Sequence, residues 1–290
     1  MSKARTQPAR TQDGIRPLPA SAGFVSRHQP APGIQIYQSE CLKLLDALIA
    51  QHPDGCFDAI FADPPYFLSN GGSSCRGGQR VKVDKGGWDK SLGPAQNHEF
   101  NLEWLRRCQQ LLKPNGTIWV SGTHHVIFSI GYAMQQLGCK ILNDIAWEKT
   151  NPPPNLGCRC FTHSTETVVW AAKNKESKHC FNYAAMKAVN GKQMKTVWRF
   201  PAPGRVEKSC GRHPTQKPMA LIERCLLAST RAEDLVLDPF LGSGTTAVAC
   251  ARLGRKCVGI EKDVSYVRLA VNRVAAEMSD NQSGITASAA

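Results

Sequence analysis

Short apolar runs alternate with amphipathic segments along residues 33–277 of this 290-residue chain. The run FDAIFA at 57–62 is followed by a helical pattern at 98–112, and TIWV at 117–120 is followed by another at 126–137. This alternation predicts one α/β domain in which a mostly parallel, twisted sheet carries helices on both faces. The remaining strands are expected at 34–37, 141–147, 166–172, 234–239 and 257–261, and the remaining helices at 40–50, 217–229, 245–253 and 264–277.

The two ends of the chain lack this pattern. Residues 1–32 are polar and contain several arginines and prolines, which predicts a disordered basic tail, and residues 278–290 are small and polar, which predicts a second disordered tail. The first residues hold no apolar core of a secretory signal, and no segment approaches the roughly 18 apolar residues of a membrane helix. These features predict a cytoplasmic protein.

The twelve cysteines are expected to be reduced thiols, because several stand inside apolar periodic segments of a chain much larger than disulfide-stapled domains. A group of cysteines and histidines could be imagined as a zinc site. Its CxC spacing is irregular and does not match a zinc finger, so no metal is predicted. The group consists of Cys158, Cys160, His163, His179 and Cys180.

Basic residues give the chain a formal net charge of +13, which favours a polyanionic partner. The excess is concentrated between positions 173 and 217, where eleven basic residues oppose two acidic ones and aromatic residues are interleaved. Basic groups neutralise phosphates, and aromatic rings stack on bases. Taken alone, this segment is interpreted equally well as a nucleic-acid surface and as a solvated basic face.

The stretch DPFLGSGTT, which begins at Asp238, joins a predicted strand to a predicted helix through a tight turn at Gly242 and Gly244. The next strand ends at Glu261, whose carboxylate can accept hydrogen bonds from both hydroxyls of a ribose. The third glycine of a dinucleotide fingerprint is missing and two threonines follow instead. A nucleoside with a short charged tail, such as S-adenosylmethionine, therefore fits better than a dinucleotide. A close-packed turn without a ligand is the alternative interpretation.

A second stretch, DPPY at 63–66, ends the strand at 57–62. Asp63 is expected at the carboxyl end of that strand, where open α/β sheets bind ligands. The prolines lack N–H donors and leave the carbonyl of Pro64 as an acceptor beside the carboxylate. Two acceptors match the two hydrogens of an amino group, and Tyr66 can lie against a flat heterocycle. A turn with a capping aspartate is the alternative for DPPY in isolation.

Four motifs resemble those of the β-class amino-methylating DNA methyltransferases, in which the catalytic motif precedes the cofactor motif. The resemblance covers residues 33–277. It implies a Rossmann-like, S-adenosylmethionine-dependent methyltransferase fold with permuted motif order, a glycine-rich loop at 69–90 that contacts DNA, and an inserted target-recognition region at 174–212. The motifs are, in chain order, DPPY at 63, HPTQKP at 213, DPFLGSGTT at 238 and GIEKD at 259.

Further stretches are similar to adenine-N6 members from bacterial restriction-modification systems, and amino-cytosine members usually carry serine where this chain has Asp63. The resemblance implies transfer of a methyl group from S-adenosylmethionine to N6 of adenine in double-stranded DNA, by base flipping and direct in-line transfer. It also implies a cognate restriction endonuclease and a homodimer as partners, and a bacterial cytoplasmic protein that associates with the nucleoid through DNA. These stretches are SNGG (69–72), KGGWDKS (85–91), NPPPN (151–155) and FTHSTE (161–166).

Three alternatives stay open. One is an N4-cytosine DNA methyltransferase, the second is an RNA or protein methyltransferase, and the third is a DNA-binding protein with a vestigial cofactor fold. In QSEC (38–41), Glu40 stands where relatives often have aspartate, so its cofactor role is open.

The resemblance assigns roles to individual residues, in three groups. The catalytic residues are Asp63, Pro64, Pro65 and Tyr66. The cofactor-binding residues are Glu40, Ala62, Asp63, His213, Lys217, Asp238, Pro239, Phe240, Gly242, Ser243, Gly244, Thr245, Thr246, Glu261 and Lys262. The DNA-binding residues are Arg76, Arg80 and Lys82 in the glycine-rich loop and Lys192, Lys195, Arg199 and Arg205 in the basic segment.

Overall fold

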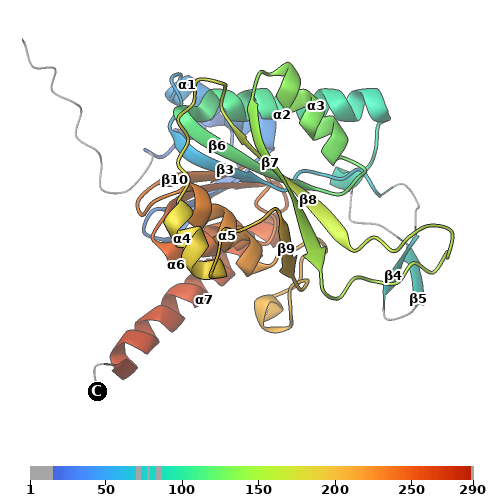
Figure 1. Cartoon of the computed structure of the whole chain (residues 1–290). Helices are drawn as coiled ribbons and strands as arrows, with labels where there is room; N and C mark the ends of the chain where they lie inside the picture. The colour runs from blue at the N-terminus through green and yellow to red at the C-terminus, as the bar shows by residue number, and fades with distance from the viewer. Residues whose placement is uncertain (1–15, 70–72, 77–78, 83–86, 289–290) are drawn as a thin grey trace, which may run out of the picture.

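The computed structural model describes residues 16–69, 73–76, 79–82 and 87–288. A nine-stranded sheet with helices on both faces forms the domain (Figure 1), and this confirms the predicted α/β architecture. The strands of the sheet are β1 (Ser26–Ala31), β2 (Ile34–Gln38), β3 (Phe57–Ala62), β6 (Leu112–Gly122), β7 (Lys140–Lys149), β8 (Thr165–Ala172), β9 (Val197–Phe200), β10 (Leu235–Asp238) and β11 (Lys256–Glu261). The helices are α1 (Cys41–Gln51), α2 (Pro94–Leu111), α3 (Ile127–Gln136), α4 (Tyr183–Asn190), α5 (Met219–Ser229), α6 (Thr245–Leu253) and α7 (Val264–Ser288).

The strand order is β1-β2-β11-β10-β3-β6-β8-β7-β9, and β2, β11, β10, β3 and β6 are parallel. Strand β8 is antiparallel to both β6 and β7. The DPPY stretch after β3 and the glycine turn after β10 therefore meet at one edge of the sheet, because their strands are parallel neighbours. We call this the carboxyl edge and the opposite one the amino edge. Strand β7 ends, and β8 begins, at the carboxyl edge.

Helices cover both faces of the sheet (Figure 1), and each face has its own apolar core. On one face, α1, α2 and α3 bury residues such as Leu44 and Trp104. On the other, α5, α6 and α7 bury residues such as Ile222 and Val248. The central strands are apolar on both sides because helices cover both faces. The sheet is thus a rigid support for the loops at its carboxyl edge.

The prediction of a disordered tail over residues 1–32 is wrong for residues 16–32. Strand β1 pairs with β2, and the buried Leu18 donates its N–H to the hydroxyl of Tyr37 at 3.2 Å. An edge strand can carry polar residues and Pro30 because its neighbour supplies the ladder of hydrogen bonds. Residues 1–15 lie outside the described residues.

Helix α7 continues to Ser288, into the segment 278–290 that the sequence predicts to be a disordered tail. Once packing has nucleated a helix, each further residue adds a hydrogen bond at small entropic cost. Two other segments also contain regular structure. Segment 174–212, for which no helix is predicted from the sequence, holds α4 and β9. Loop 69–90 holds a hairpin of β4 (Ser73–Arg76) and β5 (Gln79–Lys82).

Candidate active site

The Asp63 carboxylate stands just beyond β3 at the carboxyl edge. Its Oδ1 accepts hydrogen bonds from the hydroxyl of Tyr66 and from Oγ of Ser121, both at 2.7 Å. Its Oδ2 lies 2.5 Å from Nζ of Lys217. Three elements thus fix one carboxylate: its own loop, the end of β6 and the segment that enters α5.

Lys217 is 6% exposed and lies between two carboxylates, since its Nζ is also 3.7 Å from Oε2 of Glu166. Glu166 in turn pairs with Lys149 at 2.6 Å. Burial lowers the pKa of Lys217, but the charges of Asp63 and Glu166 outweigh it and raise that pKa above its ordinary value. Burial likewise raises the pKa of Glu166, while Lys217 and Lys149 hold it below its ordinary value. Lys217 and Glu166 therefore both carry their charges at neutral pH.

Tyr66 is buried, and its hydroxyl lies between two carboxylates, 2.7 Å from Asp63 Oδ1 and 3.2 Å from Glu166 Oε2. Burial, together with these negative charges, raises the pKa of Tyr66 well above its ordinary value. The tyrosine therefore stays a neutral hydrogen-bond donor, and its ring is held at a fixed angle beside Asp63.

Asp89 holds the backbone of the DPPY loop from inside. Its carboxylate is fully buried and accepts hydrogen bonds from the N–H of Tyr66 at 2.9 Å, the N–H of Leu68 at 3.2 Å and the hydroxyl of Ser69 at 2.9 Å. A buried carboxylate bonded to two backbone amides is a strong constraint on loop geometry. Asp89 thus fixes the loop that carries the predicted catalytic residues.

The glycine turn is shaped by left-handed backbone and close packing. Gly242 has φ +52° and Gly244 has φ +81°, and a Cβ on Gly244 would meet the backbone of Ala270 at 2.8 Å. The N–H of Gly242 donates to Glu261 at 2.9 Å. From α7, Arg273 donates to the carbonyl oxygen of Ser243 at 2.8 Å. The turn is therefore fixed both by the next strand and by the last helix.

Asp238 is buried at the end of β10 and accepts a hydrogen bond from the N–H of Phe240 at 2.9 Å. Burial raises its pKa to about 7, and the nearby charges of Asp63 and Glu261 act in the same direction. A cation placed beside Asp238 would offset that repulsion. The α-ammonium group of S-adenosylmethionine is such a cation.

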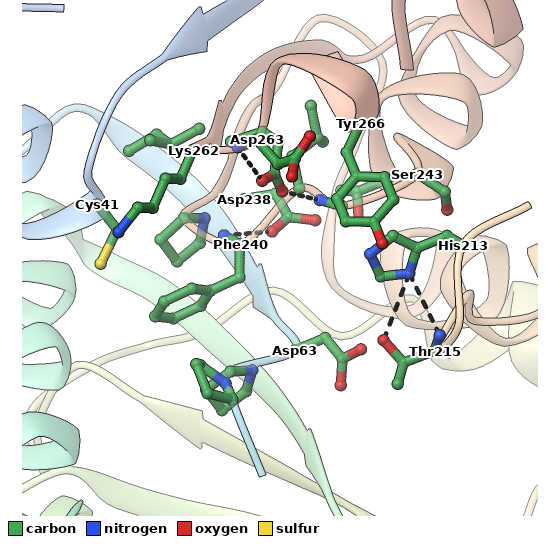
Figure 2. A pocket seen from close by; sticks show the side chains of 18 of the residues that line it. Cys41, Asp63, His213, Thr215, Asp238, Phe240, Ser243, Lys262, Asp263 and Tyr266 are labelled. Carbon is green, nitrogen blue, oxygen red and sulfur yellow. Dashed lines mark hydrogen bonds between the residues drawn. The ribbon is translucent and has the colours of Figure 1, made fainter. Parts of the chain in front are cut away.

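These groups open on one cavity of about 860 Å³. Figure 2 shows Asp63 on one side of it and Asp238 with Phe240 on the other, while the His213 and Tyr266 rings lie edge to face with centroids 4.3 Å apart. Its volume, apolar Phe240 wall and glycine turn fit an adenosine with a short charged tail. Of the predicted site residues, the cavity is lined by Glu40, Asp63, Pro64, Pro65, Tyr66, His213, Lys217, Asp238, Pro239, Phe240, Gly242, Ser243, Thr245, Thr246, Glu261 and Lys262.

Two predicted cofactor residues do not line this cavity: Ala62 is fully buried in β3, and Gly244 faces α7. Lys217 lines it, but its ammonium is bonded to Asp63 rather than standing alone as a partner for the cofactor's carboxylate. At the mouth, Lys262 pairs with Glu40 at 2.5 Å, and both side chains are largely exposed. Glu40 thus lines the cavity as the partner of Lys262, and whether it contacts the cofactor stays open.

Several residues of the site were not singled out as functional from the sequence. Asp89 and Glu166 stand inside the stretches KGGWDKS and FTHSTE, so the resemblance signalled their segments but not their roles. Ser121 follows an apolar run that ends at the same edge as Asp63. Arg273 carries no local signal, because it reaches the glycine turn only through the packing of α7.

The basic segment divides between the two edges of the sheet. Lys178 lines a cavity with Asp58 and Lys113, which stand at the amino ends of β3 and β6. Strand β9 instead pairs with the last residues of β7, toward the carboxyl edge, and its Arg199 pairs with Glu148 at 2.8 Å. The segment thus presents basic residues at both edges of the sheet, and a target-recognition region at 174–212 stays a prediction. Lys192, Lys195, Arg199 and Arg205 are exposed, and the side chains of Arg76, Arg80 and Lys82 lie outside the described part of the structure.

Among the described residues, no group of three or more histidine, cysteine or acidic side chains is arranged to hold a metal ion. Of the cysteine and histidine group, His163 stacks on His124 with ring centroids 4.4 Å apart. Within the same described ranges, no helix has the length and apolarity to span a membrane.

A family model described as DNA methylase matches residues 57–272. The chain is 57% identical over 226 residues to the Type II methyltransferase M2.DpnII of Streptococcus pneumoniae, with coverage of 77% of this chain and 84% of that protein. It is 49% identical over 239 residues to the Type II methyltransferase M2.MboI of Moraxella bovis, with coverage of 82% and 86%.

Solved structures agree with this relationship. The crystal structure of an M1.HpyAVI–SAM complex matches with a TM-score of 0.63 and 31% identity, covering 83% of this chain and 98% of that chain. The cytosine-N4-specific PvuII DNA methyltransferase matches with a TM-score of 0.66, covering 87% and 90%, and at 19% identity this similarity shows the fold alone. The family model spans most of the domain, and its range includes both the DPPY loop and the glycine turn. The chain therefore belongs to the DNA methylase family.

Proposed function

We propose that this protein transfers the methyl group of S-adenosylmethionine to N6 of adenine in double-stranded DNA. The observation that carries the proposal is that Asp63 and the glycine turn open on the same cavity. Asp63 can accept hydrogen bonds from an amino group, and the glycine turn can bind an adenosine-containing cofactor, so the two groups could meet in this cavity. When bound, the cofactor supplies an electrophilic sulfonium methyl group.

The chain's own residues activate the amine. The lone pair of an exocyclic adenine nitrogen is delocalised into the ring, which makes the nitrogen a poor nucleophile. Hydrogen bonds from its two N–H groups to Asp63 and to the carbonyl of Pro64 localise that pair and orient it. The Pro64 carbonyl accepts no hydrogen bond from any described residue, and Pro64 lines the cavity. The methyl group passes directly from the sulfonium sulfur to the nitrogen, so no covalent enzyme intermediate is needed. After transfer, the amine loses a proton to water.

The target base is stacked and paired in a duplex, so it must leave the helix to reach Asp63. The ring of Tyr66, fixed by its hydroxyl, lines the cavity where the flipped base would lie. Adenine is preferred to cytosine because Asp63, rather than the serine usual in amino-cytosine members, opens the motif. A cognate restriction endonuclease, a homodimer and association with the nucleoid stay predictions from the resemblance.

The experiment is to express the protein in a host without adenine methylation and to sequence the modified bases in its DNA. We expect N6-methyladenine at one short sequence, which identifies the base and the target together. In vitro, tritium transferred from labelled cofactor to duplex DNA should be recovered in methyladenine after digestion. Label recovered in N4-methylcytosine, in RNA or in protein would contradict the proposal.

A further inference from the structure

The aromatic side chain of Phe161 is almost completely exposed to solvent. Phe161 is 96% exposed, in the segment 150–164 that joins β7 to β8. Leu156 in the same segment is 48% exposed, and Arg159 between them is also exposed. The segment therefore presents apolar side chains and a cation to solvent. Figure 1 shows it, in yellow-green, extending away from the ends of β7 and β8.

This segment belongs to the carboxyl edge. Strand β8 begins there, and Glu166 near its start lies 3.2 Å from the Tyr66 hydroxyl. Phe161 lies five positions before Glu166, so an extended chain allows at most roughly 17 Å between their Cα atoms. At the base of the segment, His163 stacks on His124, which follows β6. Phe161 therefore stands at the carboxyl edge, on the segment that leads into Glu166.

Local contacts stiffen the tip of the segment. Asn155 donates from Nδ2 to the carbonyl oxygen of Cys160 at 2.8 Å, and its Oδ1 accepts from the N–H of Gly157 at 3.0 Å. Cys158 has φ +49°, a left-handed conformation that a non-glycine residue rarely adopts. The prolines of NPPPN restrict the chain before the tip. A stiff support reduces the entropy lost when an exposed side chain inserts into a partner.

We propose that Phe161 enters the base stack of duplex DNA at the space left by the flipped target base. This inference rests on the proposed function, because only a base-flipping enzyme creates such a space. Isolated apolar side chains are common on protein surfaces. Here, however, the ring stands on a braced segment that leads into Glu166, whose carboxylate lies 3.2 Å from the Tyr66 hydroxyl. A base pair that loses one partner leaves an unstacked gap that a flat ring fills. In the proposed complex, the exposed Arg159 contacts a phosphate beside that gap.

The test compares wild type, Phe161→Ala and Phe161→Trp on two duplexes that carry the methylated sequence mapped as above. One duplex is fully paired, and the other has an abasic site opposite the target adenine, so that the adenine is already free to leave the stack. We expect Phe161→Ala to slow single-turnover methylation of the paired duplex by about 10-fold to 100-fold, which corresponds to the loss of one stacking contact. On the abasic duplex the loss should shrink to less than about 3-fold. Phe161→Trp should stay near the native rate on both.

A matched control is Phe181→Ala, since Phe181 is half-exposed and follows Cys180, which lines the amino-edge cavity. This control should methylate both duplexes at the native rate, and cofactor affinity should be native in every variant. Equal slowing of Phe161→Ala on both duplexes, or no slowing, would overturn the stacking role alone. Dissociation of a dimer in Phe161→Ala, measured by sedimentation velocity, would overturn it in favour of a contact between copies. A wild type that methylates no adenine would overturn both proposals.

Discussion

The ammonium of Lys217 lies 2.5 Å from Oδ2 of Asp63, inside the cavity that also holds the glycine turn. The carboxylate that we propose activates the base is therefore part of a buried ion pair. Glu166 and Lys149 extend the pair into an alternating row of four charges. Such a row fixes the direction of the Asp63 carboxylate before any substrate arrives. Preorganised acceptors lose less energy to reorganisation during the reaction.

Lys217→Met should destabilise the fold, because it leaves two buried carboxylates without their shared cation. Removing one partner of a buried pair costs about 3–5 kcal/mol. We expect the double variant Asp63→Asn/Lys217→Met to regain part of that loss, because it removes an uncompensated charge. Urea unfolding of the two single variants and the double variant measures the coupling. Strictly additive losses would show that the two groups do not interact.

Asp63→Ala should abolish methylation while cofactor affinity stays within about 3-fold of native, because Asp63 acts on the base amine. Titration calorimetry measures binding, and tritium transfer measures the reaction. Glu148→Ala is a control for loss of a carboxylate, since Glu148 pairs with Arg199 on β9. That control should retain activity. Methyl transfer near the native rate in Asp63→Ala would refute the proposed mechanism.

Cofactor affinity should rise with pH through about 7, the raised pKa of Asp238. In the free protein Asp238 is protonated below that pH, and only its ionised form attracts the ammonium group of the cofactor. Each pH unit below about 7 should therefore weaken binding up to tenfold. The same shift means that Asp238 favours the unfolded state increasingly as pH rises from about 4 to about 7.

Calorimetry between pH 5.5 and 8.5 checks this dependence. Asp238→Asn should bind weakly at every pH, without the rise near 7. An Asp238→Asn profile that keeps the native pH dependence would assign the titration to another group. Unfolding of the free native protein should show the opposite trend, with stability that decreases as pH rises to about 7.

Gly244→Ala should reduce both stability and cofactor affinity, because its Cβ would meet the Ala270 backbone at 2.8 Å. Gly254→Ala is a matched control: Gly254 has φ +68°, but no atom lies within 4 Å of its added Cβ. The control should lose about 1 kcal/mol, the cost of left-handed backbone alone, and bind cofactor normally. Gly242→Val and Glu261→Ala should weaken cofactor binding as well. Equal behaviour of the two alanine variants would show that the packing against α7 is unimportant.

Neutralising Lys192, Lys195 and Arg199 together should flatten the salt dependence of duplex binding. Each lost phosphate contact reduces the slope of log affinity against log salt by about 0.9. A matched triple at the amino edge, Lys175, Lys178 and Arg231, should leave the slope unchanged, because that edge faces away from Asp63. Cofactor affinity should be native in both. If the first triple keeps the native slope, then the region near β9 is a solvated face.

Much of this protein is determined by local sequence. The period of apolar residues predicts strands such as β3 and helices such as α6, and glycines and prolines mark the two turns that carry the site. These signals extend over a few residues each, so they can be recognised without knowledge of the rest of the chain. The resemblance of the same stretches to a methyltransferase family adds their roles. Asp63 and the glycine turn could therefore be placed at one sheet edge before the structure was known.

Only the tertiary structure decides which distant groups meet those turns. Lys217 reaches Asp63 across 154 residues of sequence, and Glu166 and Arg273 reach the site from β8 and α7. Periodicity predicts whether a residue is buried. It does not predict which charged side chain that residue contacts, because contacts across a sheet depend on the order of the strands. The same reason explains the basic segment, which is continuous in sequence yet divides between two edges. A polar strand such as β1 is ordered by the hydrogen bonds of its neighbour, which no local pattern reveals.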